Sequence, residues 1–299
     1  MTSAQVLQLI RDALHQINDT SGIQTVQAVT GGYINHAFQI NTKKDRYLFK
    51  YNTHTTARLI SSEVYGLDLL RQTKTVRVPY VLAWADASED SFGWMLQEWI
   101  EPFKGNIENS AERLGVQIAS LHKAGVADYY GLDQQNYIGI SPQDNKPSSD
   151  WVSFFRDRRL LPQMILAEQN GLLSISRLDK LDRLLARLDE WLGGVERRPA
   201  LLHGDLWAGN VLYDPQGEPV VIDPAVYYGD READLAYSQW SSTAFSPKMY
   251  AAYEEVWPSE PGREERIDLY NLYHAINHLN HFGERYLDEI DRMLARYIA

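Results

Sequence analysis

The segments LLHGDLWAGN at positions 201–210 and VVIDPA at positions 220–225 decide which fold we expect for this chain. Between them, two short apolar runs flank the sequence DPQG, which is typical of a tight turn. This pattern predicts a small β-hairpin. Because a hairpin returns the chain to the point where it started, we expect Asp223 to lie near Asn210.

The two segments carry four polar side chains in a fixed order: His203, Asp205, Asn210 and Asp223. Phosphoryl transfer needs a carboxylate that orients and deprotonates the attacking hydroxyl, and oxygen ligands that hold Mg²⁺ on the phosphates of ATP. With Leu206, the first three residues match the catalytic-loop pattern H-x-D-L-x-x-x-N position for position. We therefore predict Asp205 as the catalytic base, and Asn210 and Asp223 as the metal ligands. The alternative is that Asp205 caps a helix and Asp223 ends a strand by chance, which four spaced matches in one window disfavour.

The N-terminal region supplies a lysine for the phosphates. Strands are predicted over 25–30, 37–40 and 47–50, and Lys50 is the last residue of the third strand. An ammonium group at this place meets the α- and β-phosphates in kinases. Gly31 and Gly32 form a predicted turn between the first two strands, where backbone amides can approach the phosphates with no Cβ in the way. A plain hairpin turn is the alternative for this glycine pair.

A helix is predicted over 56–72 from its apolar periodicity, and it carries Glu63. We expect Glu63 to form the ion pair that fixes Lys50, the alternative being a solvated residue on the helix surface. Two further strands, 78–82 and 94–100, complete a predicted five-stranded sheet. The end of the last strand, with Glu98, Trp99 and Ile100, is the expected hinge that offers backbone groups to adenine.

Several further stretches now allow a family to be named. In chain order they are GGYINHAF (31–38), NYIGISPQDN (136–145), FFRDRRLLPQ (154–163) and LNHFGERY (279–286). Together with HGDLWAGN and DPA, they make the chain resemble the fructosamine kinase, or ketosamine 3-kinase, family. The catalytic loop by itself is less specific, because aminoglycoside and choline kinases of the same superfamily share it.

The resemblance implies an α+β, two-lobed, protein-kinase-like fold. Its N-terminal ATP-binding lobe, residues 1–101, has a five-stranded antiparallel sheet and one main helix, and its C-terminal catalytic and substrate lobe, 102–299, is mainly helical. It also implies ATP with Mg²⁺ as the phosphate donor, and a ketosamine or glycated protein as the acceptor. The sequence departs from the family at one position of the phosphate loop. Family members from plants and many bacteria have GG-C-I-N there, whereas this chain has Tyr33 in place of the cysteine. The chain has no cysteine at all, so a thiol switch is excluded.

Composition excludes other classes of protein. The chain has 299 residues, 44% hydrophobic and 23% charged, as is ordinary for a globular protein. A formal net charge of −11 argues against nucleic acid or an anionic membrane as a partner, because both require clustered Lys and Arg. The N-terminal stretch reads as an amphipathic helix rather than a signal peptide, and no apolar run reaches membrane-spanning length. We expect a cytoplasmic protein, with a monomer favoured.

The C-terminal part is expected to be helical. Predicted helices cover 110–124, 178–192, 249–256 and 266–279. The predicted helix over 178–192 alternates Arg and Asp residues. This pattern most simply indicates a helix face that is exposed to solvent. The last one carries His274 and His278, followed by His281, at a spacing that can bind a metal. Polar packing is the favoured alternative for these histidines and for His122.

Other polar residues have open roles. Arg156, Arg158 and Arg159 either neutralise a phosphate or substrate carboxylate, or form a salt-bridged surface turn. Asp230, Glu232 and Asp234 can receive the amine of a substrate, although Asp234 looks more like a brace of the catalytic loop.

Trp207, two residues after the expected base, is a candidate for stacking on the acceptor sugar, against a purely packing role. The runner-up functions are an aminoglycoside- or choline-type kinase and a non-catalytic nucleotide-binding scaffold. Retention of Lys50, Asp205, Asn210 and Asp223 together disfavours the scaffold.

Overall fold

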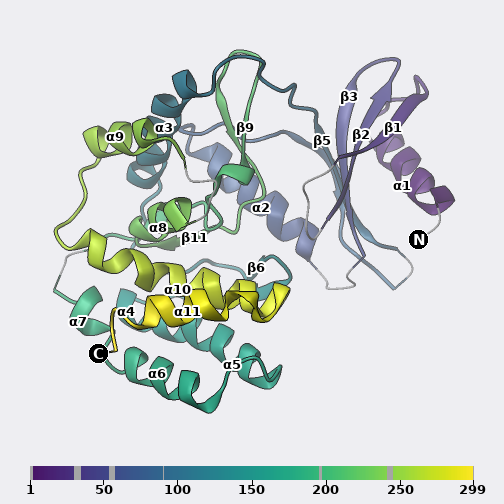
Figure 1. Cartoon of the computed structure of the whole chain (residues 1–299). Helices are drawn as coiled ribbons and strands as arrows, with labels where there is room; N and C mark the ends of the chain where they lie inside the picture. The colour runs from purple at the N-terminus through teal and green to yellow at the C-terminus, as the bar shows by residue number, and fades with distance from the viewer. Residues whose placement is uncertain are drawn as a thin grey trace. The chain divides into compact units, whose positions relative to one another are not determined.

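The computed structural model describes residues 3–29, 35–53, 58–89, 91–194, 197–240 and 245–298. The chain forms two compact units (Figure 1). The first comprises Met1–Ser110 together with Val211–Asp223, and the second comprises Ala111–Asn210 together with Pro224–Ala299. The predicted hairpin is therefore part of the first unit, although both of its flanking segments belong to the second.

The first unit contains a five-stranded antiparallel sheet in the order β1-β2-β3-β5-β4. Its strands are β1 (Ile23–Val29), β2 (His36–Thr42), β3 (Arg46–Asn52), β4 (Val81–Ala85) and β5 (Gly93–Glu98). The predicted sheet is confirmed, with shifted strand boundaries. β5 ends at Glu98 rather than at residue 100, so Trp99 and Ile100 follow the strand. β3 runs two residues beyond Lys50, because Tyr51 and Asn52 pair with Trp94 and Gly93. β4 begins at Val81 rather than at residue 78, after Pro79, which has no N–H to give to a ladder.

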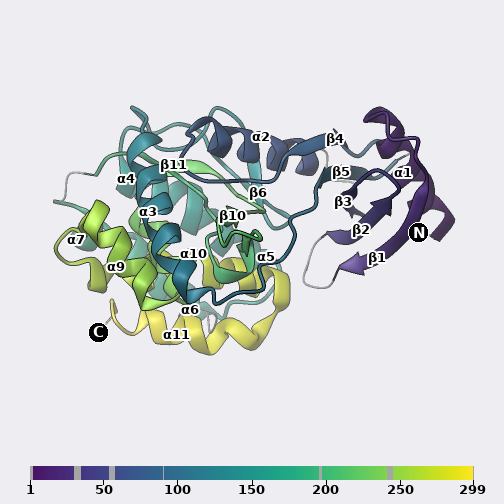
Figure 2. The ribbon, with the colours of Figure 1, turned by 90° about the horizontal axis from the view of Figure 1, so that it is seen from above.

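Helix α1 (Ser3–Gln16) covers one face of this sheet (Figures 1 and 2). Its buried face, with Ile10, Ala13 and Leu14, packs against Ile40 and Phe49 of the strands. The predicted amphipathic N-terminal helix is thus confirmed, and its apolar face is part of the core. Burying such side chains stabilises the fold by about 1.5–3 kcal/mol each.

Two more elements complete the first unit. Helix α2 (Leu59–Gln72) carries Glu63, and strands β9 (Val211–Tyr213) and β10 (Pro219–Val221) form the predicted hairpin. The hairpin is anchored by Arg77, which forms an ion pair with Asp214 and whose carbonyl accepts from the amide of Val221.

The second unit is mainly helical, as predicted. Its helices are α3 (Glu108–Ala124), which starts in the first unit, α4 (Trp151–Phe155), α5 (Leu161–Gln169), α6 (Ile175–Leu185), α7 (Asp189–Leu192), α8 (Glu232–Trp240), α9 (Pro247–Val256), α10 (Arg263–Phe282) and α11 (Leu287–Leu294). Two short sheets pair β6 (Asn136–Ile138) with β7 (Ser141–Gln143), and β8 (Ala200–Leu202) with β11 (Tyr227–Gly229). A π-helical turn, Arg156–Leu160, joins α4 to α5.

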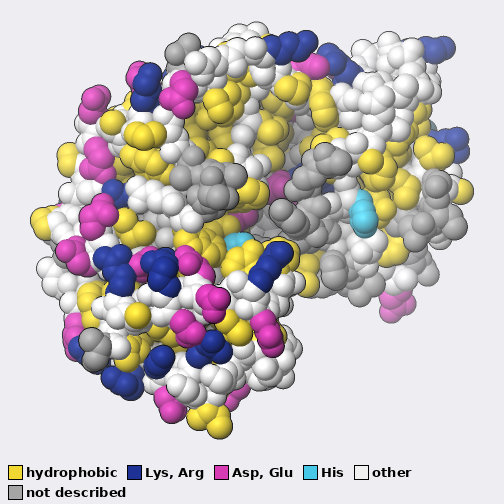
Figure 3. Space-filling view, viewed as in Figure 1, with side chains coloured by type: hydrophobic (Ala, Val, Ile, Leu, Met, Phe, Trp, Pro, Cys, Tyr) yellow, Lys and Arg dark blue, Asp and Glu magenta, His cyan; other side chains and the backbone are white. Residues whose placement is uncertain are grey.

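The single helix predicted over 178–192 is wrong. The structure has two helices there, α6 and α7, because the amide of Arg187 bonds to the carbonyl of Leu184 only three residues back, which tightens and ends α6. Acidic and basic side chains are interspersed on the face of the second unit seen in Figure 3. Among the described residues, no helix has both the length and the apolar character that a bilayer crossing requires.

Asp19 joins three parts of the first unit. Its carboxylate accepts hydrogen bonds from the amide and hydroxyl of Ser21, from Thr42 Oγ1 at 2.7 Å and from the Tyr47 hydroxyl at 3.0 Å. Burial alone would raise the pKa of Asp19, but these hydrogen bonds outweigh it and lower the pKa to about 2. The ionised carboxylate therefore links the end of α1 to β2 and β3.

Replacing Asp19 with alanine should lower the free energy of unfolding by about 1–3 kcal/mol at neutral pH, since buried donors lose their acceptor. A folded-state pKa below the ordinary 3.8 means that this stabilisation is present above pH 3.8 and is lost as the pH falls towards 2. Urea denaturation of both proteins at neutral pH and near pH 3 measures the difference. If the two proteins differ in their free energy of unfolding by the same amount at both pH values, the lowered pKa of Asp19 is contradicted.

Candidate active site

The predicted catalytic loop, residues 203–210, follows β8, and the side chain of Asp234 holds its backbone. Asp234 Oδ2 accepts from the amide of His203 at 2.7 Å, and Oδ1 accepts from the amide of Gly204 at 2.9 Å. His122 is fully buried and bridges Asp234, at 3.1 Å, to the hydroxyl of Tyr253, at 2.9 Å. The predicted bracing role of Asp234 and the structural role of His122 are confirmed.

Gly204 is required by the same loop. Its φ of +79° lies in the left-handed region, and a Cβ there would stand 2.0 Å from the carbonyl oxygen of Ala225. The amide of Ala225 in turn donates to the carbonyl of His203 at 2.9 Å. The loop and the segment after Asp223 are thus in direct backbone contact within the second unit.

Asp205 and Asn210 lie together at the end of this loop. The Asn210 side-chain amide donates to the Asp205 carbonyl at 2.9 Å and to Asp205 Oδ2 at 2.8 Å. Since its Nδ2 is directed at Asp205, the atom that Asn210 can offer to a cation is Oδ1. An amide oxygen beside a carboxylate is the kind of donor that Mg²⁺ accepts, so these residues fit the metal implied by the motif.

Lys50, Glu63 and Asp223 lie together in the first unit. The Lys50 ammonium is 3.0 Å from Glu63 Oε1 and forms a second ion pair with Asp223. Burial lowers the pKa of Lys50, but the charges of Asp223 and Glu63 outweigh it, so the pKa is raised above its ordinary value and the ammonium is retained. The expected Lys50–Glu63 ion pair is confirmed.

Asp223 has an unusual backbone. Its φ of 54° places it in the left-handed region, which few non-glycine residues adopt, although aspartate tolerates it better than most. Such a conformation persists where the surrounding structure over-determines it. Asp223 is therefore a residue whose placement depends on what holds its neighbours.

The remaining nucleotide-side residues are only partly described. Gly31 and Gly32 lie outside the described residues. At the expected hinge, the Glu98 amide donates to the Tyr80 carbonyl at 2.9 Å, and Trp99 Nε1 donates to Glu101 at 3.3 Å. Ile100 is buried. The hinge role of Glu98, Trp99 and Ile100 stays a prediction.

The indole of Trp207 folds back over Gly209. A Cβ on Gly209 would lie 2.2–2.5 Å from three atoms of the indole. The ring of Trp207 is half-buried, and its position requires a glycine two residues later. The sequence W-A-G contains the signal for this packing, since a glycine follows the tryptophan by two residues.

The three histidines of α10 pack and form hydrogen bonds. His274 stacks on Tyr237 with ring centroids 3.6 Å apart, and His278 Nδ1 donates to the His274 carbonyl at 2.7 Å. His281 Nδ1 donates to the Asn277 carbonyl, and its Nε2 accepts from the amide of Ile140. Burial lowers the pKa of His278 to about 4, so its ring is neutral at physiological pH. The packing interpretation is confirmed, and no three or more His, Cys, Asp or Glu side chains among the described residues are grouped so that they could hold a metal ion.

The basic cluster divides into two kinds of residue. Arg156 pairs with Asp157 and Arg158 pairs with Asp144, as expected of a salt-bridged turn. Arg159 instead is fully buried, with its guanidinium 3.9 Å from the ring centroid of Tyr227. Sequence reasoning missed this burial. Arg159 lies in the π-helical turn Arg156–Leu160, a kind of turn that is often found at functional sites.

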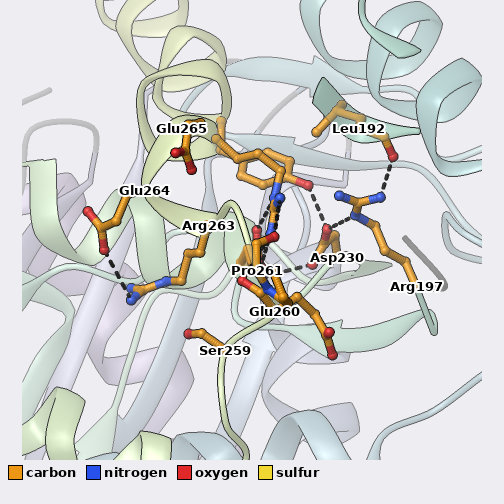
Figure 4. Close-up of polar contacts among 12 residues, drawn as sticks. Leu192, Arg197, Asp230, Ser259, Glu260, Pro261, Arg263, Glu264 and Glu265 are labelled. Atoms are coloured by element: carbon orange, nitrogen blue, oxygen red, sulfur yellow. Dashed lines mark hydrogen bonds and ion pairs between the residues drawn. The ribbon is translucent and has the colours of Figure 1, made fainter. Parts of the chain in front are cut away.

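Asp230 and Glu232 are buried in ion pairs. Asp230 pairs with Arg197 (Figure 4). It also accepts from the Tyr270 hydroxyl, and Glu232 pairs with Arg266. Both carboxylates are thereby occupied, so the suggestion that they receive a substrate amine is wrong.

Tyr237 is a residue that the sequence reasoning missed. Burial, together with the charge and a hydrogen bond of Asp205, raises the pKa of Tyr237 well above its ordinary value. The signal was its position three residues after Asp234, which puts both side chains on neighbouring parts of one helix face. Tyr237 joins an aromatic cluster with His274, Trp240 and His278.

Comparison with known proteins now decides the family. The model of the fructosamine kinase family matches residues 6–299. The chain belongs to the fructosamine kinase family. It is 36% identical to the chloroplastic protein-ribulosamine 3-kinase of Arabidopsis thaliana over 97% of this chain and 87% of that protein.

Solved structures agree on the fold. A structure from Haemophilus somnus that carries the name fructosamine-3-kinase superposes with a TM-score of 0.86, at 25% identity and 97% coverage of both chains. The aminoglycoside phosphotransferase APH(4)-Ia has a TM-score of 0.65 at 15% identity, covering 100% of both chains, which shows the shared kinase-like fold alone. The predicted family and fold class are thus confirmed.

Gly204→Ala should destabilise the protein strongly, because the new Cβ would collide with the carbonyl oxygen of Ala225. The matched control is Gly171→Ala, which has a similar φ of +68° but nothing within 4 Å of the new Cβ. We expect the control to cost about 1–2 kcal/mol, from backbone strain alone, and Gly204→Ala to cost several kcal/mol more or to prevent folding. Thermal unfolding of both variants measures this, and equal costs would refute the predicted collision.

Proposed function

We propose that the protein is an ATP-dependent kinase that phosphorylates the 3-hydroxyl of ketosamines, such as fructosamine and ribulosamine adducts, as a protein-deglycation or repair activity. The observation that carries the proposal is the braced loop in which Asn210 fixes Asp205, in a chain of the fructosamine kinase family. The relative named a protein-ribulosamine 3-kinase supports the choice of acceptor and of hydroxyl.

In the proposed mechanism, Asp205 accepts the proton of the acceptor hydroxyl as the hydroxyl oxygen bonds to the γ-phosphorus in line, and the bond from that phosphorus to the departing ADP breaks. Lys50, held by Glu63, binds the phosphates of ATP, and a phosphate-binding role for Gly31 and Gly32 is kept as a proposal. Asn210 Oδ1 and the Asp223 carboxylate are the proposed Mg²⁺ ligands, and a bound Mg²⁺ would neutralise charge on the phosphates.

We propose that Asp205 and Asn210 of the second unit and Lys50 and Asp223 of the first take part in the same reaction. The proposed ATP-binding lobe is 1–101, with Glu98, Trp99 and Ile100 as the adenine hinge, and 102–299 is the proposed catalytic and substrate lobe. Inclusion of the segment ending at Asp223 in the first compact unit supports a shared role of Lys50 and Asp223.

The acceptor is a cationic amine joined to a sugar, which suits this chain. The net charge of −11 favours a cation, and the neutral ring of Tyr237, which forms a hydrogen bond with Asp205, lies beside the proposed base. We propose that Trp207 stacks on the sugar. We also keep as proposals a small-molecule or glycated-protein partner, a cytoplasmic location and a monomeric state, without nucleic acid or membrane partners.

Asp205→Asn should reduce kcat by several decades, because the amide cannot accept the hydroxyl proton. Turnover of ATP with Mg²⁺ is measured against fructoselysine, ribuloselysine, an aminoglycoside and choline. Asp157→Asn, which removes a carboxylate from a surface ion pair with Arg156, is the control and should keep normal turnover. Near-normal kcat in Asp205→Asn would contradict the role of base, and turnover of only the aminoglycoside or choline would overturn the acceptor.

Gly209→Ala should raise the KM for a ketosamine several-fold and leave the KM for ATP unchanged, because the new Cβ displaces the indole of Trp207. Trp207→Ala should change the same constant in the same direction. Steady-state kinetics with each substrate varied in turn distinguishes the two constants. If both variants keep the wild-type KM and kcat for the ketosamine, Trp207 has only a packing role.

A further inference from the structure

A buried chain of side-chain amides lies under the segment that follows Asp223. It is formed by Asn136, Gln143 and Asn145 of the β6–β7 hairpin, each at most 4% exposed. Asn136 Nδ2 donates to the Val226 carbonyl at 2.7 Å, and Gln143 Nε2 donates to the Ala225 carbonyl at 3.3 Å. We refer to these three residues as the amide network. The mechanism described above assigns them no task.

The direction of every hydrogen bond in the amide network is set by Arg159. A guanidinium can only donate, and Arg159 Nη2 donates to Asn145 Oδ1 at 2.7 Å. Asn145 must therefore turn its NH₂ towards Asn136, where Nδ2 donates to Oδ1 at 2.7 Å. Asn136 in turn must direct its own NH₂ at the carbonyl of Val226. A reversal of either amide would place two donors or two acceptors face to face.

Gln143 completes the amide network. Its Nε2 faces Asn136 Oδ1 at 3.1 Å and the carbonyl of Ala225, which can only accept, so Gln143 Oε1 is turned towards the Tyr273 hydroxyl, which donates to it at 2.8 Å. Tyr273 is fully buried on α10, and burial helps to raise its pKa above the ordinary value, which keeps the hydroxyl protonated as a donor.

The held segment is connected to both proposed catalytic carboxylates. Ala225 follows Asp223 by two residues, with the rigid ring of Pro224 between them. The amide of Ala225 donates to the carbonyl of His203, which precedes Asp205 by two residues. With its amide bound to the catalytic loop and its carbonyl bound to Gln143, Ala225 is fixed on both sides. Asp223 has a left-handed backbone, so its conformation depends on such support.

We infer that the amide network, oriented by Arg159 and held by Tyr273, positions the loop that carries Asp223. The inference rests on the proposed role of Asp223 as a Mg²⁺ ligand. It also gives a physical task to NYIGISPQDN, the stretch that distinguished this chain from other kinases sharing the catalytic loop.

Tyr273→Phe tests the inference, because it removes only the hydroxyl that holds Gln143 Oε1. The measured quantity is the affinity for Mn²⁺ in the presence of ADP. Electron paramagnetic resonance of free Mn²⁺ gives this affinity, and the measurement requires neither acceptor nor turnover. We expect the affinity to fall about tenfold, as when an outer contact of a metal ligand is lost, and kcat to fall more than the KM for ATP changes. Tyr297→Phe is the control, since it removes a buried hydroxyl that donates to the Glu265 carbonyl at 2.7 Å, away from the network.

A second variant, Gln143→Met, removes the donor itself with little change of volume. It should weaken Mn²⁺ binding at least as much, and the double variant with Tyr273→Phe should be no weaker than Gln143→Met alone, because Tyr273 acts through Gln143. Wild-type affinity in both single variants, or an equal loss in Tyr297→Phe, would overturn the inference.

The proposed function fails separately. Wild-type protein that binds Mn²⁺ with ADP but transfers nothing to ketosamines would remove the proposed acceptor, while the Mn²⁺ affinities would still decide the inference. Unchanged Mn²⁺ affinity in Asp223→Ala would instead remove Asp223 as a ligand, and the inference with it.

Discussion

The carboxylate of Asp234 accepts hydrogen bonds from the backbone amides of both His203 and Gly204, and the catalytic loop depends on this contact. An unpaired buried amide costs about 1–3 kcal/mol, so one carboxylate that satisfies two of them fixes the loop firmly. The buried ring of His122 continues the contact to Tyr253 on α9. The loop that presents Asp205 is therefore held by three separated segments of the second unit.

The catalytic loop has a second support at Ala225. The amide of Ala225 bonds to His203 and its carbonyl bonds to Gln143, so the loop is held by the charged side chain of Asp234 and, through Ala225, by the neutral side chain of Gln143. The amide network that contains Gln143 takes its direction from the guanidinium of Arg159, which lies over the ring of Tyr227. The aromatic face of Tyr227 stabilises this buried cation.

How much of this could be predicted from the sequence varied with the range of the interaction. Strands and the Lys50–Glu63 pair were predicted because their signals are local: alternating apolar residues, a turn sequence, and a carboxylate on the next helix. The catalytic-loop residues were predicted because their spacing is fixed by chemistry. The break between α6 and α7 was missed because Ala186 and Arg187 are good helix formers, and tertiary packing overrides such a weak preference. The pairing of Asp230 with Arg197, and the burial of Arg159, depend on contacts between distant segments that no local pattern encodes.

The two compact units are not two consecutive stretches of chain. The segment Val211–Asp223 belongs to the first unit, while the residues on either side of it belong to the second. During synthesis, the sheet of the first unit emerges from the ribosome early, but the hairpin that joins it at Arg77 emerges only after about a hundred further residues have been made. Lys50 likewise lacks Asp223 until then. The first unit therefore reaches its native charge balance late in translation, when much of the second unit is already available to fold.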